Sequence, residues 1–340
     1  MKNLKDILIK KRDDIPALAP SRVLILFGAV LLLSAFAAVG AGGLVFLFLA
    51  GALYAYLILG MKSPLPLILI PLAFGISFLV SQSIEDALWV ILVFVPVGYI
   101  LAYCVYQRKN LSVTTIMLTV AIGAVLSLMV IWAAHETYHA GIIGSVKQMA
   151  REMNTQAREY LAGFKIPQSE TESFSLTEEM IDGYMEMVIM ILPAVCIVTC
   201  QILGYISAKL FRLLVLICGT DEVFFKTSWA VSLGTPAAAI YLVSLFASMF
   251  IPVPVISYSA INLMMIIMPA ACIVGFRGFF GNGGLLRRPM KKSTKTGLII
   301  VLAVLFFMAP SMLTQVLALF ACFGAVARAW MLSKIRKGRN

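Results

Sequence analysis

The chain has 340 residues, of which 61% are hydrophobic and only 13% are charged, and its mean hydropathy is +0.98. This composition excludes a soluble domain of any size and predicts an all-α, polytopic transmembrane bundle. The net charge of +11 is explained by membrane topology and by attraction to the anionic head groups of the lipid bilayer, so no nucleic-acid partner is expected.

Ten apolar blocks predict about ten membrane spans, five within 22–134 and five within 184–332. Most blocks approach the roughly 20 residues that cross a hydrocarbon core. Two tight turns, at 40–43 and 309–311, separate neighbouring spans, because a single helix over 297–327 would be roughly 46 Å long. The blocks are 22–38, 44–60, 65–80, 88–106, 113–134, 184–207, 228–250, 260–276, 297–308 and 313–332.

The distribution of basic residues predicts the orientation of these spans. With the amino terminus inside, the outer loops hold few of the 27 Lys and Arg residues, namely Lys147, Arg151, Arg158 and Lys165. Because Lys and Arg in short loops determine orientation, we expect an N-in, C-in topology with cytoplasmic basic tails at 1–21 and 333–340. The first span also imitates a signal peptide, but an uncleaved anchor is favoured because the 21 residues before it are long for such a signal.

The segment 135–183 is the one long predicted loop, and we expect it to be extracytoplasmic. Apolar residues recur in it at three- and four-residue spacing from Ile142 to Phe164, which predicts an amphipathic helix over 141–165. That helix is either a lid over a site that opens outward or an ordered loop without a gating role. Further on, Ser175 and Glu178 form a capping-box pattern, which predicts a helix that runs directly into the sixth span.

The sharpest chemical motif is H-E-x-x-H, formed by His135, Glu136 and His139, which include both histidines of the chain. On a helix the two imidazoles lie one turn apart and can share a zinc ion, with Glu136 as general base. Glu178 and Asp182 lie on the same predicted side and are further ligand candidates. A zinc-dependent metallopeptidase, a non-catalytic metal or pH-sensitive pair and ordinary interfacial side chains all stay open, because so short a motif also arises by chance.

Two polar side chains, Gln201 and Asn262, lie deepest in the predicted spans and should face the bundle interior. They either bond neighbouring helices or line a polar cavity that binds a ligand. Prolines also interrupt several apolar blocks, and broken membrane helices often border ligand sites. These prolines are Pro71, Pro96, Pro193, Pro236 and Pro269.

Several motifs in order resemble the YybS-like family of bacterial multi-pass membrane proteins. They are the acidic stretch 176–181, the run Ile191-Leu-Pro-Ala194, the span end 205–212, and Trp229 followed by Pro236. This functionally uncharacterised family is considered distantly similar to the substrate-binding subunits of energy-coupling-factor vitamin transporters. The resemblance implies a location in the bacterial cytoplasmic (inner) membrane and argues against a protease.

Three functions remain in view, of which small-molecule binding or transport is favoured. It would use a site that opens outward near Gln201 and Asn262, with a partner membrane protein or ATPase module. The second is the zinc metallopeptidase, which is the single enzymatic alternative. The third is a non-catalytic membrane scaffold in envelope machinery, for which small-residue faces such as Gly123 with Ser127 and Ser244 with Ser248 would suit helix partners.

Overall fold

The computed structural model describes residues 17–39, 43–61, 64–137, 148, 151–152, 155–156, 178–218, 230–280, 294, 296–301, 304 and 309–337, and at some helix ends it describes the backbone alone. Within these residues all regular structure is helical and there is no strand, so the all-α prediction is confirmed. The helices are α2 (Pro20–Val39), α3 (Gly43–Gly60), η1 (Leu65–Ile68), α4 (Leu69–Ser81), α5 (Ile84–Tyr106), α6 (Leu111–Thr137), α9 (Glu178–Ile217), α11 (Thr235–Phe250), α12 (Pro254–Phe280) and α14 (Pro310–Lys337).

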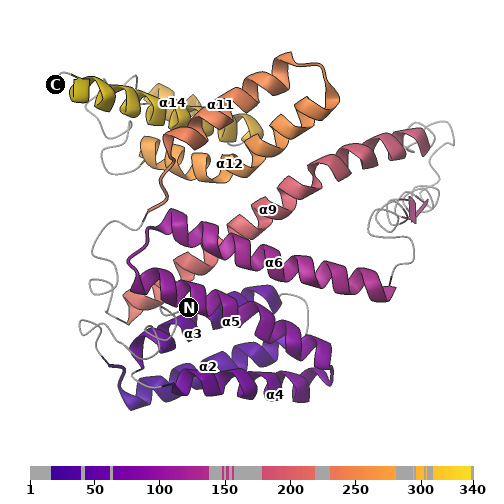
Figure 1. The fold of residues 1–340 in the computed structure, drawn as a ribbon, viewed down its shortest axis with the longest axis vertical. Helices are drawn as coiled ribbons and strands as arrows, with labels where there is room; N and C mark the ends of the chain where they lie inside the picture. The colour runs from indigo at the N-terminus through magenta and orange to yellow at the C-terminus, as the bar shows by residue number, and fades with distance from the viewer. Residues whose placement is uncertain are drawn as a thin grey trace.

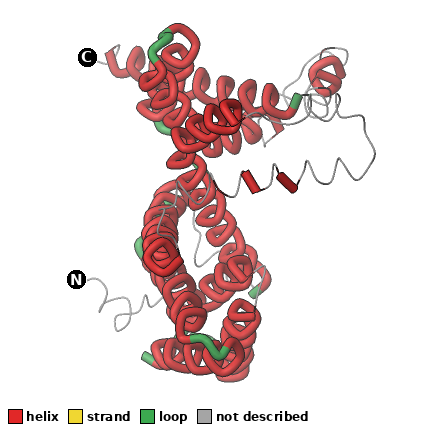
Figure 2. Tube along the Cα trace, turned by 90° about the vertical axis from the view of Figure 1, so that its right-hand side faces the viewer, coloured by secondary structure: helices red, strands yellow, loops and turns green. Residues whose placement is uncertain are grey.

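The described helices form two packed groups that are joined by α9 (Figure 1). The N-terminal group consists of α2 to α6, and the C-terminal group consists of α11, α12 and α14. Helix α9 has 40 residues, which corresponds to roughly 60 Å, and it packs against α3 and α6 on one side and α12 on the other. Viewed from the side, the two groups lie above and below a narrow waist (Figure 2).

The N-terminal group is built around α3, of which 72% of the span is buried. Its partner is α5, and the two helices approach closely because glycine occupies the crossing on both sides. A Cβ on Gly98 would lie 2.6 Å from Cδ1 of Tyr54, and one on Gly51 would lie 2.8 Å from Cγ1 of Val97. The Tyr54 ring also packs edge-on against Phe94, with ring centroids 5.4 Å apart. Small residues at a crossing let membrane helices gain van der Waals contact, which is the main source of their association.

The C-terminal group packs through a core of small side chains. Its buried residues are Ala238, Tyr241, Ala271, Ala318, Ala321, Cys322 and Ala325. Helices α12 and α14 come so close that a Cβ on Gly275 would collide with the backbone carbonyl of Leu317. This group has no fully enclosed helix, since only 17% of the α12 span is buried.

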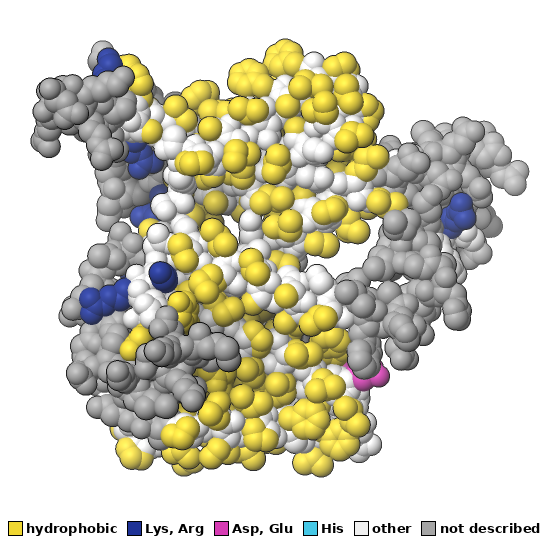
Figure 3. Space-filling model, in the orientation of Figure 1, with side chains coloured by type: hydrophobic (Ala, Val, Ile, Leu, Met, Phe, Trp, Pro, Cys, Tyr) yellow, Lys and Arg dark blue, Asp and Glu magenta, His cyan; other side chains and the backbone are white. Residues whose placement is uncertain are grey.

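Charged side chains collect at the two ends of the bundle (Figure 3). In the chain, basic residues occupy the first turn of α2, the turn between α5 and α6, the last turn of α12, and the C-terminal parts of α9 and α14: Arg22, Arg108, Lys109, Arg277, Lys209, Arg212, Arg328 and Lys334. Acidic residues occupy the starts of α5 and α9: Glu85, Asp86, Glu178, Glu179 and Asp182. Because neighbouring helices alternate in direction, these sets define a basic end and an acidic end, and N-in orientation remains a prediction.

Seven described helices are long and apolar enough to cross a membrane, and two shorter apolar helices, Leu65–Ser81 and Thr235–Phe250, accompany them. Every predicted span except 297–308 coincides with one of these nine, and that span is only partly described. Its helical residues 296–301 and the start of α14 at Pro310 agree with the predicted turn. The chain is therefore a multi-pass membrane protein, and the number of spans stays a prediction.

Some helix boundaries differ from the predicted ones for local reasons. Helix α5 begins at Ile84, four residues early, because the hydroxyl of Ser83 accepts a hydrogen bond from the Asp86 N–H at 3.2 Å. Helix α11 begins late, after extended backbone at Gly234, and Pro236 lies in its first turn. Pro71 likewise lies in the first turn of α4. Neither proline breaks a helix, whereas Pro96, Pro193 and Pro269 lie inside helices.

Candidate functional site: a cavity between the two helix groups

A cavity of about 330 Å³ lies between the two helix groups, on the side of the basic end. Helices α6 and α9 form one wall, and α12, the start of α11 and the segment before it form the other. Its walls are mainly apolar. The lining residues are Ser112, Thr115, Ile116, Thr119, Gln201, Ile202, Tyr205, Val231, Ser232, Leu233, Gly234, Ala237, Ile266, Ile267, Pro269, Ala270 and Ile273.

Helix α9 contributes the polar groups that are best placed to bind a ligand. Gln201 and Tyr205 are one turn apart, and both side chains line the cavity. Neither the Gln201 amide nor the Tyr205 hydroxyl is hydrogen-bonded to the part of the chain that the structure describes. Polar groups inside a protein are nearly always satisfied, so water or a ligand is expected to bond these two.

Helix α6, which forms this wall together with α9, contributes hydroxyl groups to the cavity lining. The hydroxyl of Thr115 donates to the Leu111 carbonyl at 2.9 Å, and that of Thr119 donates to the Thr115 carbonyl at 2.8 Å. Their hydrogens are used within the helix, so these oxygens offer lone pairs to the cavity. Close packing of α6 on α9 is possible because of Gly204, where a Cβ would lie 3.1 Å from the Leu118 Cβ.

A pair of serines connects the two helix groups at the basic end of the cavity. The N–H of Ser232 donates to the Ser112 hydroxyl at 2.9 Å, and the two hydroxyl oxygens lie 3.4 Å apart. Ser112 is in the first turn of α6, while Ser232 lies in the non-helical segment before α11. These hydrogen bonds accompany apolar contacts across the boundary, because Val231 and the α12 residues Ala270 and Ile273 pack against the core of the N-terminal group.

Asn262 lies elsewhere, although the sequence grouped it with Gln201. Its amide donates to the Met190 carbonyl at 2.8 Å and so joins α12 to α9. Its carbonyl oxygen is buried and has no hydrogen-bond partner. Asn262 does not line the cavity. Its position agrees with the alternative in which it bonds neighbouring helices to each other.

The residues of the zinc hypothesis are only partly described. His135 and Glu136 lie in the last turn of α6, and Glu178 and Asp182 lie in the first turns of α9. The structure describes the backbone of these four residues but not their side chains. His139 lies outside the described residues. Those two helix ends diverge at the acidic end of the bundle (Figure 1). The described side chains include no group of three or more His, Cys, Asp or Glu that could hold a metal. The zinc site remains a prediction.

The amphipathic segment 141–165 also lies almost wholly outside the described residues, so its proposed action as a lid remains a prediction. The cavity lies toward the basic end, whereas the sequence led us to expect a site that opens toward the predicted outer, acidic side. The predicted entry of a continuous helix into the sixth span does agree with α9, which runs unbroken from Glu178 to Ile217.

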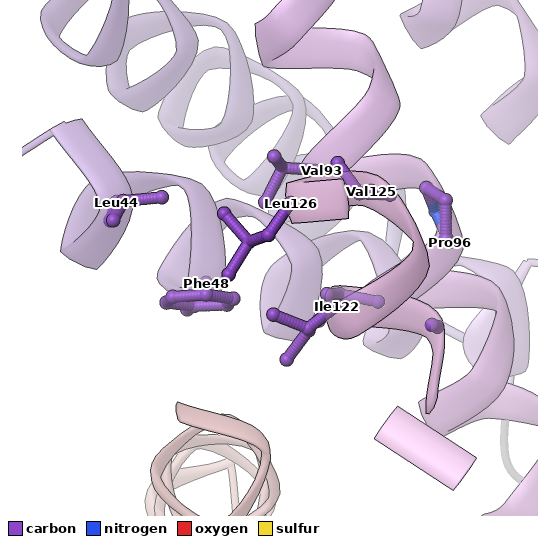
Figure 4. A pocket seen from close by; sticks show the side chains of 9 residues that line it. Leu44, Phe48, Val93, Pro96, Ile122, Val125 and Leu126 are labelled. Atoms are coloured by element: carbon purple, nitrogen blue, oxygen red, sulfur yellow. The ribbon is translucent and has the colours of Figure 1, made fainter. Parts of the chain in front are cut away.

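A second hollow, between α3, α5 and α6 in the N-terminal group, is too small and too apolar to be a ligand site (Figure 4). Its volume is about 10 Å³, and its lining includes Phe48, Pro96 and Ile122. That is the space of about one water molecule, with no polar atom to bond it. It is best explained as a packing gap beside the proline of α5.

Sequence reasoning identified Gln201 but missed the other polar groups of the cavity. Ser112, Thr115 and Thr119 recur at spacings of three and four, which is a hydroxyl stripe along one face of a helix. That signal was available in the sequence. Tyr205 and Ser232 carried no comparable signal, because their place depends on how α9 and the segment before α11 pack.

The comparisons with known proteins identify a family without assigning an activity. No curated protein and no solved structure matches the chain. A family model described as predicted membrane protein (DUF2232) matches residues 27–280, a stretch that contains every helix lining the cavity. The chain therefore belongs to the DUF2232 family of membrane proteins.

Proposed function

We propose that this protein binds a small, largely apolar molecule in the cavity between its two helix groups and carries it across the membrane. The observation that supports this most is the pair Gln201 and Tyr205, two polar residues that line an apolar cavity and have no hydrogen bond from their polar groups to the described chain. A few convergent polar groups in an apolar cavity are typical of small-molecule sites.

The size of the cavity defines the class of ligand. Its volume of about 330 Å³ is at the lower end of typical ligand pockets, and it holds on the order of ten water-sized groups. Gln201 both donates and accepts, Tyr205 donates, and the Thr115 and Thr119 oxygens accept. These groups fit one polar function on an apolar body.

Transport is supported by the position of the cavity. Membrane transporters commonly bind substrate at the boundary of two helix bundles that move against each other. Here the boundary consists of α9, its contacts with α12, and the Ser112–Ser232 hydrogen bonds. The resemblance to YybS-like proteins, and through them to energy-coupling-factor subunits, supports a partner membrane protein or ATPase module as the source of energy.

The other two hypotheses have less support. The described contacts include none that favours a peptidase. For the scaffold hypothesis, Ser244 is buried within the C-terminal group, so that small-residue face is already packed inside the molecule. On the other face, Ser127 is exposed, but no described contact points to a partner protein there.

The proposal is tested by thermal stabilisation of purified protein with a library of small apolar and amphipathic compounds. A ligand that binds the folded state alone raises the melting temperature, and the rise continues with the logarithm of the ligand concentration above Kd. The blocking variant is Ala237→Phe, because Ala237 lines the cavity, and the matched control is Ala239→Phe, an exposed position on the same helix.

The proposal predicts that some compounds stabilise the wild type and the Ala239→Phe control but not Ala237→Phe, while all three have similar melting temperatures without ligand. Stabilisation that survives in Ala237→Phe would place binding elsewhere and contradict the proposed site. A library without a single stabilising compound would count against small-molecule binding.

A further inference from the structure

The cavity walls continue toward the basic end into positive charge. Along α9, the cavity-lining residues Gln201 and Tyr205 are followed one turn later by Lys209. The ammonium group of Lys209 lies 5.4 Å from the centroid of the Tyr205 ring, so it stands directly beside a lining residue. On α12, the lining residue Ile273 is followed one turn later by Arg277.

The two cations come from different helices, and each lies one turn beyond a residue that lines the cavity. Arg277 is close enough for its charge to influence both Tyr205 and Lys209. Neither Lys209 nor Arg277 is paired with a carboxylate in the part of the chain that the structure describes. Arg212, one turn of α9 further along, adds to the positive potential at Lys209.

Cations at the inner ends of helices are ordinary in membrane proteins, but two features set these apart. Lys209 is half-buried, and its ammonium group lies against the ring of Tyr205, which lines the cavity. Like charges from α9 and α12 also repel each other at this boundary, and a bound anion would relieve that repulsion. An anion bound near both cations, at this end of the cavity, would offset the cost of that repulsion.

We infer that the ligand is an anionic amphipath, with its apolar body in the cavity and its carboxylate or phosphate at Lys209 and Arg277. This inference rests on the proposed function, since it names the class of ligand for the same cavity. The polar groups deeper in the cavity, Gln201 and the α6 hydroxyls, then bond polar atoms in the body of the ligand.

The test uses two fluorescent probes that differ only in charge, dansylglycine and the neutral dansylamide. Each is titrated into protein in nanodiscs of zwitterionic lipid, and the signal of empty nanodiscs is subtracted. Lys209→Gln with Arg277→Gln removes both cations. Arg328→Gln is the control, because Arg328 is also at the basic end but lies on α14, which does not line the cavity.

We expect wild-type protein to bind dansylglycine at least tenfold more tightly than dansylamide. The double variant should lose this preference while it keeps its affinity for dansylamide, which also shows that it is folded. Arg328→Gln should behave as wild type. Raising the salt concentration should reduce the preference, mostly through Arg277, which is exposed, and less through Lys209, which is half-buried.

Equal binding of both probes to the wild type would overturn the anionic ligand and leave the proposed function intact. Loss of the preference in Arg328→Gln would also overturn it, because general surface potential would then be its cause. Failure of both probes to bind saturably would contradict the proposed function itself.

One further arm separates the two sources of such an anion. Phosphatidylglycerol is added to the nanodiscs, and displacement of dansylglycine is measured. Displacement identifies a membrane lipid as the occupant, and dansylglycine binding that persists identifies a soluble organic anion. Both results support an anionic amphipath.

Discussion

The two helix groups hold together in different ways. The N-terminal group encloses a central helix, α3, whose aromatic and aliphatic side chains are packed on all sides. The C-terminal group has no central helix, and α12 and α14 instead meet backbone to backbone at Gly275 and Leu317. The first group has a large core around a central helix, whereas the second has a smaller core of mainly small side chains and is held by close helix crossings. The second group is the better candidate for the moving part of a transporter.

Gly275→Ala should have the largest effect on this comparison, because the new methyl group would meet backbone and not a movable side chain. We expect a loss of about 2 kcal/mol or more in the stability of the C-terminal group. Cys322, which is buried on α14, should then react at least tenfold faster with a maleimide, while Cys104 on α5 stays protected. Peptide mass spectrometry identifies the labelled thiol.

The control for this change is Gly324→Ala on α14, where a Cβ would meet nothing within 4 Å. It should leave both thiols protected. Equal exposure of Cys104 and Cys322 in Gly275→Ala would mean that the two groups unfold as one unit, and the contrast drawn above would be wrong.

Gly98→Ala is the reciprocal change in the N-terminal group. Its methyl group would meet the Tyr54 ring, which is confined by Phe94 and Tyr99, so we expect a loss of about 1–3 kcal/mol. Cys104 should become reactive before Cys322 does. Gly75→Ala, with no atom within 4 Å of its Cβ, is the matched control, and faster labelling of Cys322 in Gly98→Ala would contradict separate cores.

Gln201→Leu and Asn262→Leu sharpen the comparison at the boundary between the groups. Gln201 lines the cavity, so its loss should weaken binding of a stabilising ligand about tenfold, the value of one or two hydrogen bonds. Asn262→Leu removes one hydrogen bond but also an unpartnered buried oxygen, and stability should change by less than about 1 kcal/mol. Ligand titration measures the change in affinity, and thermal melting measures the change in stability. If Asn262→Leu weakened binding and Gln201→Leu did not, Asn262 and not Gln201 would be the ligand-binding residue.

The smallest expected effect is at the turn between α4 and α5. Gln82 ends α4 in the left-handed region, at φ 54°, which costs a residue with a Cβ about 1 kcal/mol. Gln82→Gly should therefore raise the melting temperature slightly, and Gln82→Val should lower it. A higher melting temperature for Gln82→Val than for Gln82→Gly would show that Gln82 does not adopt the left-handed conformation at this turn.

The sequence predicted the helical fold well because apolar length and basic loop residues are local signals. Blocks such as 44–60 and 88–106 coincide with α3 and α5 because only a helix satisfies the backbone in lipid. Boundaries such as Ile84 depended on a single cap at Ser83, a weaker signal. The prolines misled at Pro71 and Pro236, since composition cannot tell a first turn from a helix interior.

The candidate site was less predictable from the sequence, because it depends on packing between distant segments. Polarity in an apolar block singled out both Gln201 and Asn262; the structure places Gln201 in the cavity lining and Asn262 in a hydrogen bond to the Met190 carbonyl. The H-E-x-x-H motif drew attention to the acidic end, whereas the cavity lies toward the basic end. Its second wall comes from residues 231–237, about 120 positions from Ser112, a distance that no periodicity spans.

The most direct test of the central claim, an accessible cavity between the two groups, is the reactivity of a cysteine at Thr119. Thr119 lines the cavity, and Thr114, on the same helix, is fully buried against the core. We predict that Thr119→Cys reacts with a small neutral maleimide in membranes, that Thr114→Cys does not, and that adding Ala237→Phe protects Thr119→Cys. If Thr119→Cys is as inert as Thr114→Cys, the groups enclose no accessible cavity and the account is wrong.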